Sequence, residues 1–85
     1  MDESERVTAT LILRVMAEAD PSALVRVLMP FQNLNIVPRC VSAELASTRV
    51  LHIRVELPGF AEERLTQIAA KLAEFPYVLR AYWHC

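Results

Sequence analysis

The sequence predicts an α+β fold: a ferredoxin-like βαββαβ sandwich, in which a four-stranded antiparallel sheet carries two helices on one face. Two hydrophobic patterns support this fold class. Strand-like segments alternate apolar and polar residues, and two segments between them place apolar residues every three to four positions, as amphipathic helices do. With 85 residues, the chain is long enough for one small domain. Two right-handed βαβ crossovers in such a chain favour this arrangement.

The first two elements are a strand and a helix. Alternation from Val7 to Met16 predicts a long, half-buried strand. Asp20 offers an N-cap acceptor before Pro21, so we expect a helix over about 21–33 with Pro21 at its first position. Its buried stripe is predicted to be Leu24, Val27, Leu28 and Phe31. Pro30 lies inside this helix and is expected to kink its last turn.

The turn after this helix lacks glycine, although such turns commonly need a positive φ. The chain has one glycine in total, Gly59. Asn tolerates the left-handed region better than other non-glycine residues, so Asn35 is predicted to be the C′ residue. A strand over 36–44 is expected next. Because Pro38 has no N–H to donate, this strand is placed at an edge of the sheet.

The second half repeats the pattern of strand, helix and strand. Val50 to Leu57 alternates cleanly, with an apolar face of Leu51, Ile53, Val55 and Leu57 and a polar face of His52, Arg54 and Glu56. A helix follows after Pro58 and Gly59, and its predicted buried stripe is Leu65, Ile68, Ala69, Leu72 and Phe75. A final strand is expected over 77–83, with one face formed by Tyr77, Leu79, Ala81 and Trp83. The first and third strands are then central.

Composition predicts a single domain over residues 7–85 preceded by a flexible tail, residues 1–6. The start has neither the basic nor the apolar region of a secretory signal, and no apolar run approaches the length of a membrane span, so we expect a cytoplasmic protein. Nine basic and ten acidic residues give a net charge of −1, which creates no field for nucleic acid. Hydrophobic residues make up 54% of the chain, a surplus that could cover a partner.

Catalytic and metal-binding signatures are missing from the sequence. Cys40 and Cys85 have neither CxxC nor Cys/His ligand spacing, and we expect reduced thiols. No paired carboxylates, GxSxG or phosphate loop is present, so neither catalysis nor a cofactor or metal is expected. The first loop, residues 17–22, also lacks the CxxC that a metallochaperone would need.

Nucleic-acid binding through the open face of the sheet is a weaker alternative. Arg14, Arg54 and Arg80 are predicted to lie on that face, but Glu56 lies there too. The two central strands offer no aromatic side chains for stacking bases. We therefore favour a solvated surface over a nucleic-acid platform.

From Asp20 onward the chain resembles an ACT domain, specifically that of the small regulatory subunit of acetolactate (acetohydroxyacid) synthase. The resemblance in the first half is carried by Leu24, Arg26, Val27, Phe31 and Val41. In the second half it is carried by Leu51, Ile53, Val55, Gln67, Ile68, Lys71, Leu72, Glu74, Phe75 and Val78. Both halves agree at the same βαββαβ spacing.

The resemblance implies a non-catalytic regulatory domain that forms a homodimer, usually edge to edge, and binds a small amino acid such as valine near the first loop and helix. The residues that would then contact the effector are Asp20, Ser22, Ala23, Leu24, Asn35 and Val37. Several departures weaken that site. Ser22 and Asn35 replace glycines of the family pattern, Val37 replaces an asparagine, and Ala19 replaces a polar loop residue. An unpaired buried polar group costs roughly 1 to 3 kcal/mol, so a loop with fewer polar side chains should hold a zwitterion poorly.

Two functional hypotheses follow. The first is a small subunit with a degenerate effector site, which binds and activates a catalytic large subunit of acetolactate synthase through its apolar surplus. The alternative is a free-standing ACT domain that binds a small amino acid, using the helix start at residues 21–24 for the carboxylate, and signals by dimerisation. A domain that only self-associates is a third reading. Pro38 is an obstacle to edge-to-edge pairing in each case, because it removes a donor from the edge strand.

Overall fold

The computed structural model describes residues 10–85, and the predicted tail and the first three residues of the predicted first strand lie outside this range. Its elements follow the order strand, helix, strand, strand, helix, strand. They are β1 (Thr10–Glu18), α2 (Ala23–Asn33), β2 (Cys40–Leu45), β3 (Val50–Pro58), the short 3₁₀ helix η1 (Gly59–Ala61), α3 (Glu62–Ala73) and β4 (Val78–His84).

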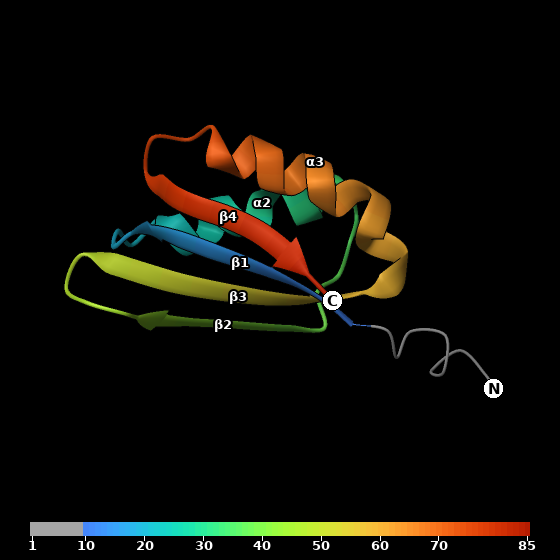
Figure 1. Ribbon diagram of the computed structural model, residues 1–85, viewed down its shortest axis with the longest axis horizontal. Helices are drawn as coiled ribbons and strands as arrows, with labels where there is room; N and C mark the ends of the chain where they lie inside the picture. The colour runs from blue at the N-terminus through green and yellow to red at the C-terminus, as the bar shows by residue number, and fades with distance from the viewer. Residues whose placement is uncertain (1–9) are drawn as a thin grey trace.

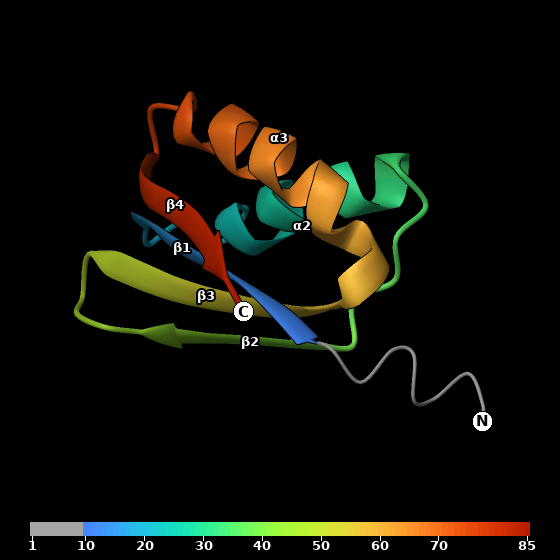
Figure 2. The same ribbon diagram turned by 45° about the vertical axis from the view of Figure 1, so that its right-hand side comes forward.

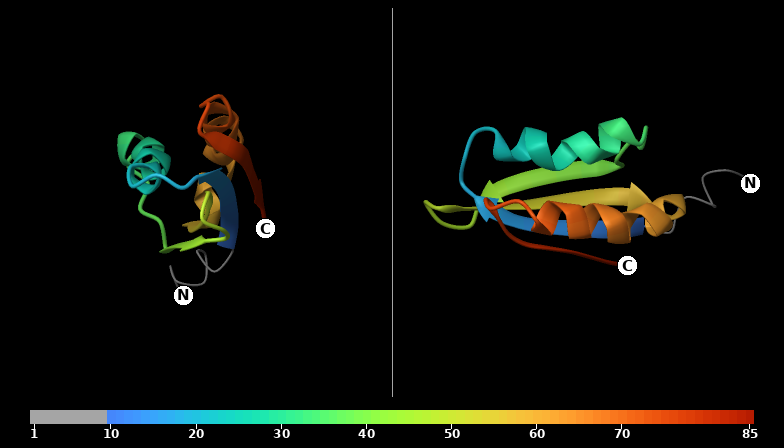
Figure 3. Two further views of the ribbon diagram at one scale, coloured as in Figure 1. Left: turned by 90° about the vertical axis from the view of Figure 1, so that its left-hand side faces the viewer. Right: turned by 90° about the horizontal axis from the view of Figure 1, so that it is seen from above.

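The four strands form one antiparallel sheet in the order β2-β3-β1-β4 (Figure 1). Both helices lie on the same face of this sheet, as the turned view also shows (Figure 2). The predicted fold class is therefore confirmed, with β1 and β3 central and β2 at an edge. Seen from above, α2 and α3 run antiparallel to each other across the sheet (Figure 3).

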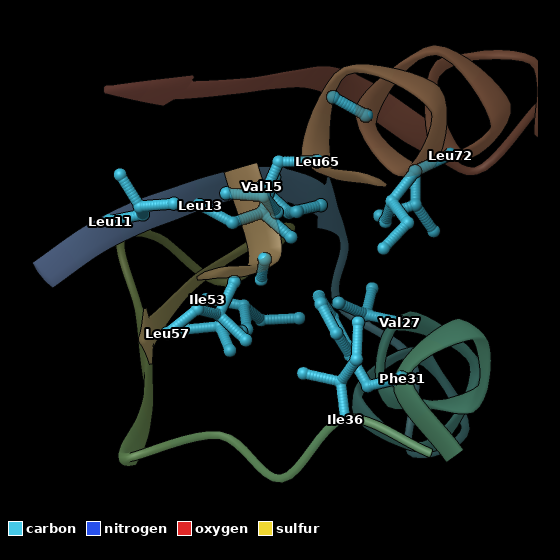
Figure 4. Close-up of a cluster of buried hydrophobic side chains, with 14 of the residues drawn as sticks. Leu11, Leu13, Val15, Val27, Phe31, Ile36, Ile53, Leu57, Leu65 and Leu72 are labelled. Carbon is cyan, nitrogen blue, oxygen red and sulfur yellow. The ribbon is translucent and has the colours of Figure 1, made fainter. Parts of the chain in front are cut away.

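The core lies between the sheet and the helices. Alternate residues of β1 and β3 point toward the helices, and apolar residues of α2 and α3 meet them (Figure 4). The fully buried larger side chains are Leu13, Val15, Val27, Phe31, Ile53, Val55, Leu57, Leu65 and Leu72. Each such side chain contributes about 1.5–3 kcal/mol relative to an exposed position. The predicted stripes of the third strand and of the first helix are confirmed, with Leu24, Leu28 and Leu51 only partly buried.

The end of α2 is a Schellman motif. Asn35 has a φ of 60°, so it takes the left-handed conformation predicted for it. Its N–H donates to the carbonyl of Gln32 (3.1 Å), and the N–H of Ile36 donates to the carbonyl of Phe31 (2.8 Å). Phe31 and Ile36 are both buried, which supplies the apolar contact that accompanies this motif (Figure 4). The chain is thereby turned back toward the sheet.

Two boundaries near α2 differ from the prediction. The helix begins at Ala23 with Ser22 as its N-cap, so Asp20 and Pro21 precede the helix instead of starting it. β2 begins at Cys40, and Pro38 therefore lies in the connection before the strand. The N–H of Arg39 donates to the carbonyl of Glu56 (2.7 Å) and leads the chain into the ladder. Pro38 consequently takes no donor away from β2.

The predicted alternation of the last strand is wrong at the start of β4. The register between β1 and β4 shifts between Met16 and Ala17, so that Arg80 is opposite Met16 and Val78 is opposite Ala17. Leu79 is the extra residue of this irregularity and is 55% exposed, whereas Val78 is buried. The other end of the strand keeps the predicted face, with Ala81 and Trp83 packed against the core.

The predicted stripe of the second helix needs one correction. Leu65, Ile68, Ala69 and Leu72 are buried, but α3 ends at Ala73. Phe75 therefore lies beyond the helix and is 39% exposed. Its ring stacks on Tyr77, with centroids 5.3 Å apart and an interplanar angle of 13°.

Candidate functional site

The loop between β1 and α2 carries two of the predicted effector contacts, Asp20 and Ser22, and they bind each other. One carboxylate oxygen of Asp20 accepts from the backbone N–H of Ser22 (2.8 Å) and from its hydroxyl (2.6 Å). The Ser22 hydroxyl and then its N–H lower the pKa of Asp20, because both stabilise the ionised carboxylate. The polar side chains of this loop thus already have partners within the loop.

The other predicted contacts are distributed over both ends of α2. Ala23 is buried at the start of the helix and Leu24 beside it is half-buried. Asn35 and Val37 follow the far end, which an 11-residue helix places roughly 16 Å away. Within one chain, the structure therefore does not bring Asn35 and Val37 to the loop that holds Asp20 and Ser22.

The edge strand β2 is exposed along its whole length. Its residues Val41, Ala43 and Leu45 are opposite the core residues Val55, Ile53 and Leu51 of β3, and so lie on the helix side of the sheet. Neither helix covers them: Leu45 is 63% exposed, and Val37, just before the strand, is 77% exposed. Val25 on α2 is exposed as well. This edge is an apolar surface without a covering element among the described residues.

The open face of the sheet carries cations and aromatic rings. Arg14 Nε donates to His84 Nε2 (3.0 Å), the ring of His84 stacks on Tyr82, and the guanidinium of Arg80 lies 4.6 Å from the Tyr82 centroid. Arg54 forms an ion pair with Glu56. Sequence reasoning considered aromatic residues on the central strands only and so missed Tyr82, which comes from the edge strand β4.

A groove runs between α2 and α3, with a volume of about 820 Å³; we call it the interhelical groove. Its lining is mainly apolar and comes from both helices and from the connection to β4, including Met29, Pro30, Leu34, Ile68, Phe75 and Tyr77. Within the described part of the chain, its charged lining residues are Arg26 and Lys71, and Asn33 and Gln67 add amide groups. The guanidinium of Arg26 lies 5.2 Å from the centroid of the Tyr77 ring, so a contact across the groove joins its two sides.

Other groups of interest are scattered. Cys40 and Cys85 are both exposed free thiols. In the part of the chain that the structure describes, no three His, Cys, Asp or Glu side chains gather to form a metal site. Neither α2 nor α3 is long and apolar enough to cross a membrane.

Two solved structures have the same fold as this chain. The ACT domain of the GTP pyrophosphokinase of Chlorobium tepidum is similar with a TM-score of 0.72 and 10% identity, over 89% of this chain and 85% of that one. The C-terminal domain of the MgtC protein of Mycobacterium tuberculosis is similar with a TM-score of 0.70 and 18% identity, over 88% of this chain and 84% of that one. At these identities, the similarity establishes the fold.

No curated protein matches the sequence. The sequence model of a family described as an ACT-like domain matches residues 4–84. This match covers both halves of the chain, in which the βαβ units of the sheet lie. The chain therefore belongs to the family of ACT-like domains.

Proposed function

We propose that this chain is a non-catalytic regulatory domain that works as a homodimer, in which β2 of one protomer pairs antiparallel with β2 of its partner. The observation that carries this proposal is the edge strand itself, whose six residues are all exposed. An uncovered edge is a template for a further strand, and in a twofold dimer the same strand serves both partners. Burial of Val41 and Leu45 against the partner adds an apolar contribution.

The hydrogen-bond pattern of β2 leaves donors and acceptors for such a partner. The N–H of Ala46 donates to the carbonyl of Val50 (2.9 Å), which makes these two residues a hydrogen-bonded pair in the β2–β3 hairpin. In an antiparallel ladder the bonding direction alternates, so the backbone groups of Val41, Ala43 and Leu45 point away from β3. Pro38 precedes these residues and does not interrupt them.

The dimer also gives the predicted effector contacts a way to meet. In a twofold antiparallel pair, the start of one β2 lies beside the end of its partner's β2. Asn35 and Val37 precede the start of β2, whereas the loop after β1 lies near its end, because the N–H of Ala19 donates to the carbonyl of Arg49 (2.9 Å). Two composite sites per dimer result, each taking one part from each protomer.

In our proposal these composite sites are degenerate. A bound amino acid needs polar groups that replace its lost water, but the Asp20 carboxylate and the Ser22 hydroxyl already satisfy each other. Val37 adds only an apolar side chain. The domain would then act through a protein partner. The sequence resemblance suggests that this partner is a catalytic subunit of the acetolactate synthase type.

The mass of the protein in solution tests the dimer. We expect light scattering to give twice the protomer mass of 9.6 kDa. Ala43→Pro removes an outward-pointing donor and should yield the monomer, while the hydrogen bonds to β3 remain. Ser42→Lys, at the next residue but on the open face, is the control and should stay dimeric. A wild-type monomer at high concentration contradicts the dimer.

Titration calorimetry with each of the common amino acids tests the degenerate site. We expect no saturable heat with the wild-type dimer. Saturable binding that Ser22→Ala weakens would overturn the degenerate site and favour the alternative, a free-standing amino-acid sensor. Co-purification with the large subunit of an acetolactate synthase, and a change in its activity, tests the partner. If the large subunit neither binds nor responds, that assignment fails while the dimer remains.

A further inference from the structure

We propose that the interhelical groove binds a small amphipathic carboxylate, with its acidic head at Arg26 and Lys71 and its apolar body along the rest of the groove. The groove is distinct from the edge strand and from the β1–α2 loop, because its lining comes from α2, α3 and the connection to β4 of one chain. This inference is therefore independent of dimerisation and of an amino-acid effector.

The size of the groove favours a small molecule. Its volume of about 820 Å³ falls within the 300–1,000 Å³ that is usual for small-molecule sites. From Arg26 to Asn33, α2 provides a wall that is roughly 10 Å long at 1.5 Å per residue. Tyr77 lies in the connection from α3 to β4, so its contact with Arg26 joins the two sides of the groove at that end.

The chemistry of the lining selects an apolar body. Met29 and Phe75 leave 48% and 39% of their surface exposed, and Leu34 leaves 37%. These large apolar side chains lie along one continuous groove with Ile68 and Pro30. A flexible alkyl chain can follow such a wall, and the thioether of Met29 adapts readily to it. Removal of this apolar surface from water supplies the main part of the binding free energy.

The charges of the lining select the head group. Arg26 and Lys71 contribute positive charge, and no Asp or Glu among the residues that the structure describes lines the groove. The guanidinium of Arg26 lies over the Tyr77 ring in a cation–π contact, which restrains the Arg26 side chain. The N–H donors of Arg26 are therefore held in place at the groove. Guanidinium and ammonium groups bind carboxylates through charge-assisted hydrogen bonds. A neutral or cationic amphiphile of the same length should therefore bind the groove more weakly than the carboxylate.

Decanoate is the probe, with decan-1-ol and decyltrimethylammonium as matched neutral and cationic chains. We expect saturable binding of one decanoate per protomer, weaker binding of decan-1-ol and none of the cation. In ¹H–¹⁵N spectra, decanoate should shift the amides of Met29, Leu34, Ile68 and Lys71. Absence of saturable decanoate binding, equal affinity for the alcohol, or shifts confined to the open sheet face would each overturn the proposal.

Charge variants test the head group. Arg26→Gln and Lys71→Gln should each weaken decanoate binding by roughly two- to fivefold, the effect of an exposed ion pair, and leave decan-1-ol binding unchanged. Arg49→Gln is the matched control, because it removes the same charge from an exposed turn outside the groove. An equal loss in Arg49→Gln would mean that net charge, and not the groove, attracts the carboxylate.

Apolar-to-acidic variants on α2 test the body of the site. Met29→Glu places a carboxylate in the groove and should abolish decanoate binding, whereas Val25→Glu lies outside it on the same helix and should not. Retained circular dichroism shows that both variants fold. Undiminished binding by Met29→Glu contradicts the proposal. The monomeric Ala43→Pro variant should bind decanoate as the wild type does, so that failure of the dimer and failure of this site are distinguishable.

Discussion

Asn35 shows how much a single residue can decide in this chain. It is the one non-glycine residue with a positive φ among residues 10–85, and the turn that it makes places Ile36 in the core beside Phe31. Its conformation followed from the sequence because the absence of glycine at a helix end leaves asparagine as the residue best suited to the left-handed region. The pattern was local, and the outcome was therefore predictable.

Substitution of Asn35 tests this account. Asn35→Ala should lower the free energy of unfolding by about 1 kcal/mol, because alanine resists a positive φ, and Asn35→Gly should be neutral or stabilising. Urea denaturation of both variants measures the change. Asn33→Ala is the control: Asn33 lies in α2, where alanine is the better helix former. Equal destabilisation by Asn33→Ala and Asn35→Ala would contradict a special role of position 35.

The Asp20–Ser22 pair predicts a pH dependence. The pKa of Asp20 is lowered in the folded state, first by the Ser22 hydroxyl and then by its N–H. The folded state therefore prefers the ionised carboxylate. Its stabilising contribution is present above the pKa of the unfolded chain and is lost as the pH falls through the lower, folded pKa.

An NMR titration of the Asp20 side-chain carbon measures this pKa directly. Ser22→Ala should raise the pKa of Asp20 toward its ordinary value, because the first of its two hydrogen bonds is removed while the backbone N–H remains. Ser47→Ala, in the exposed turn between β2 and β3, should leave the pKa of Asp20 unchanged. A pKa of Asp20 that is the same in Ser22→Ala and the wild type would contradict the assigned cause.

At the scale of elements, regular spacing predicted the type and order of the two α-helices and the four strands, but not the short 3₁₀ helix η1. The alternation of β3 is unbroken, and its inward face was predicted correctly. In β4, parity placed Leu79 inward, but the register shift near Ala17 turned it out and brought Val78 in. Nothing in the local sequence marks that shift, because it arises from pairing with a distant strand. Phe75 followed the helical spacing beyond the point where α3 ends.

Pro30 lies inside α2 and makes this helix suboptimal. A proline in a helix interior lowers the free energy of unfolding by about 3 kcal/mol. It also restricts the unfolded chain, which raises the free energy of unfolding by up to about 1 kcal/mol. Pro30→Ala should therefore raise the free energy of unfolding by about 2 kcal/mol, as measured by urea denaturation. Gln32→Ala, at an exposed position of the same helix, should change it by less than about 0.5 kcal/mol. A destabilised Pro30→Ala would show that the ring is needed for packing in the groove.

For the whole molecule, stability depends on one layer between the sheet and the helices. The candidate site was less predictable than the fold. A family pattern identifies residues that would contact an effector, but it does not show whether these residues lie close together within one chain. Asp20 and Ser22 lie at one end of α2 and Asn35 and Val37 at the other. The interhelical groove was not predicted, since Arg26, Lys71 and Tyr77 come together only when both crossovers have folded.

Neighbouring residues of the central strand β1 test this layer. Leu13 is fully buried, whereas Ile12 lies half-buried on the open face. Leu13→Ala should cost about 3 kcal/mol, a large share of the roughly 4 to 13 kcal/mol expected for a chain of this length. Ile12→Ala should cost about 1 kcal/mol. Thermal or urea unfolding compares them, and equal losses would mean that the open face is packed as tightly as the core.

The exposure of all six residues of β2 has a consequence for local motion. This strand has one neighbour, β3, and no buried residue, so few contacts hold it closed against solvent. Segments of that kind open with the smallest free energy in a domain, and their amides exchange hydrogen for deuterium long before those of central strands. The amides of Val41, Ala43 and Leu45 are thus natural reporters: slow deuterium uptake there would reveal that another chain occupies the edge, whatever its identity.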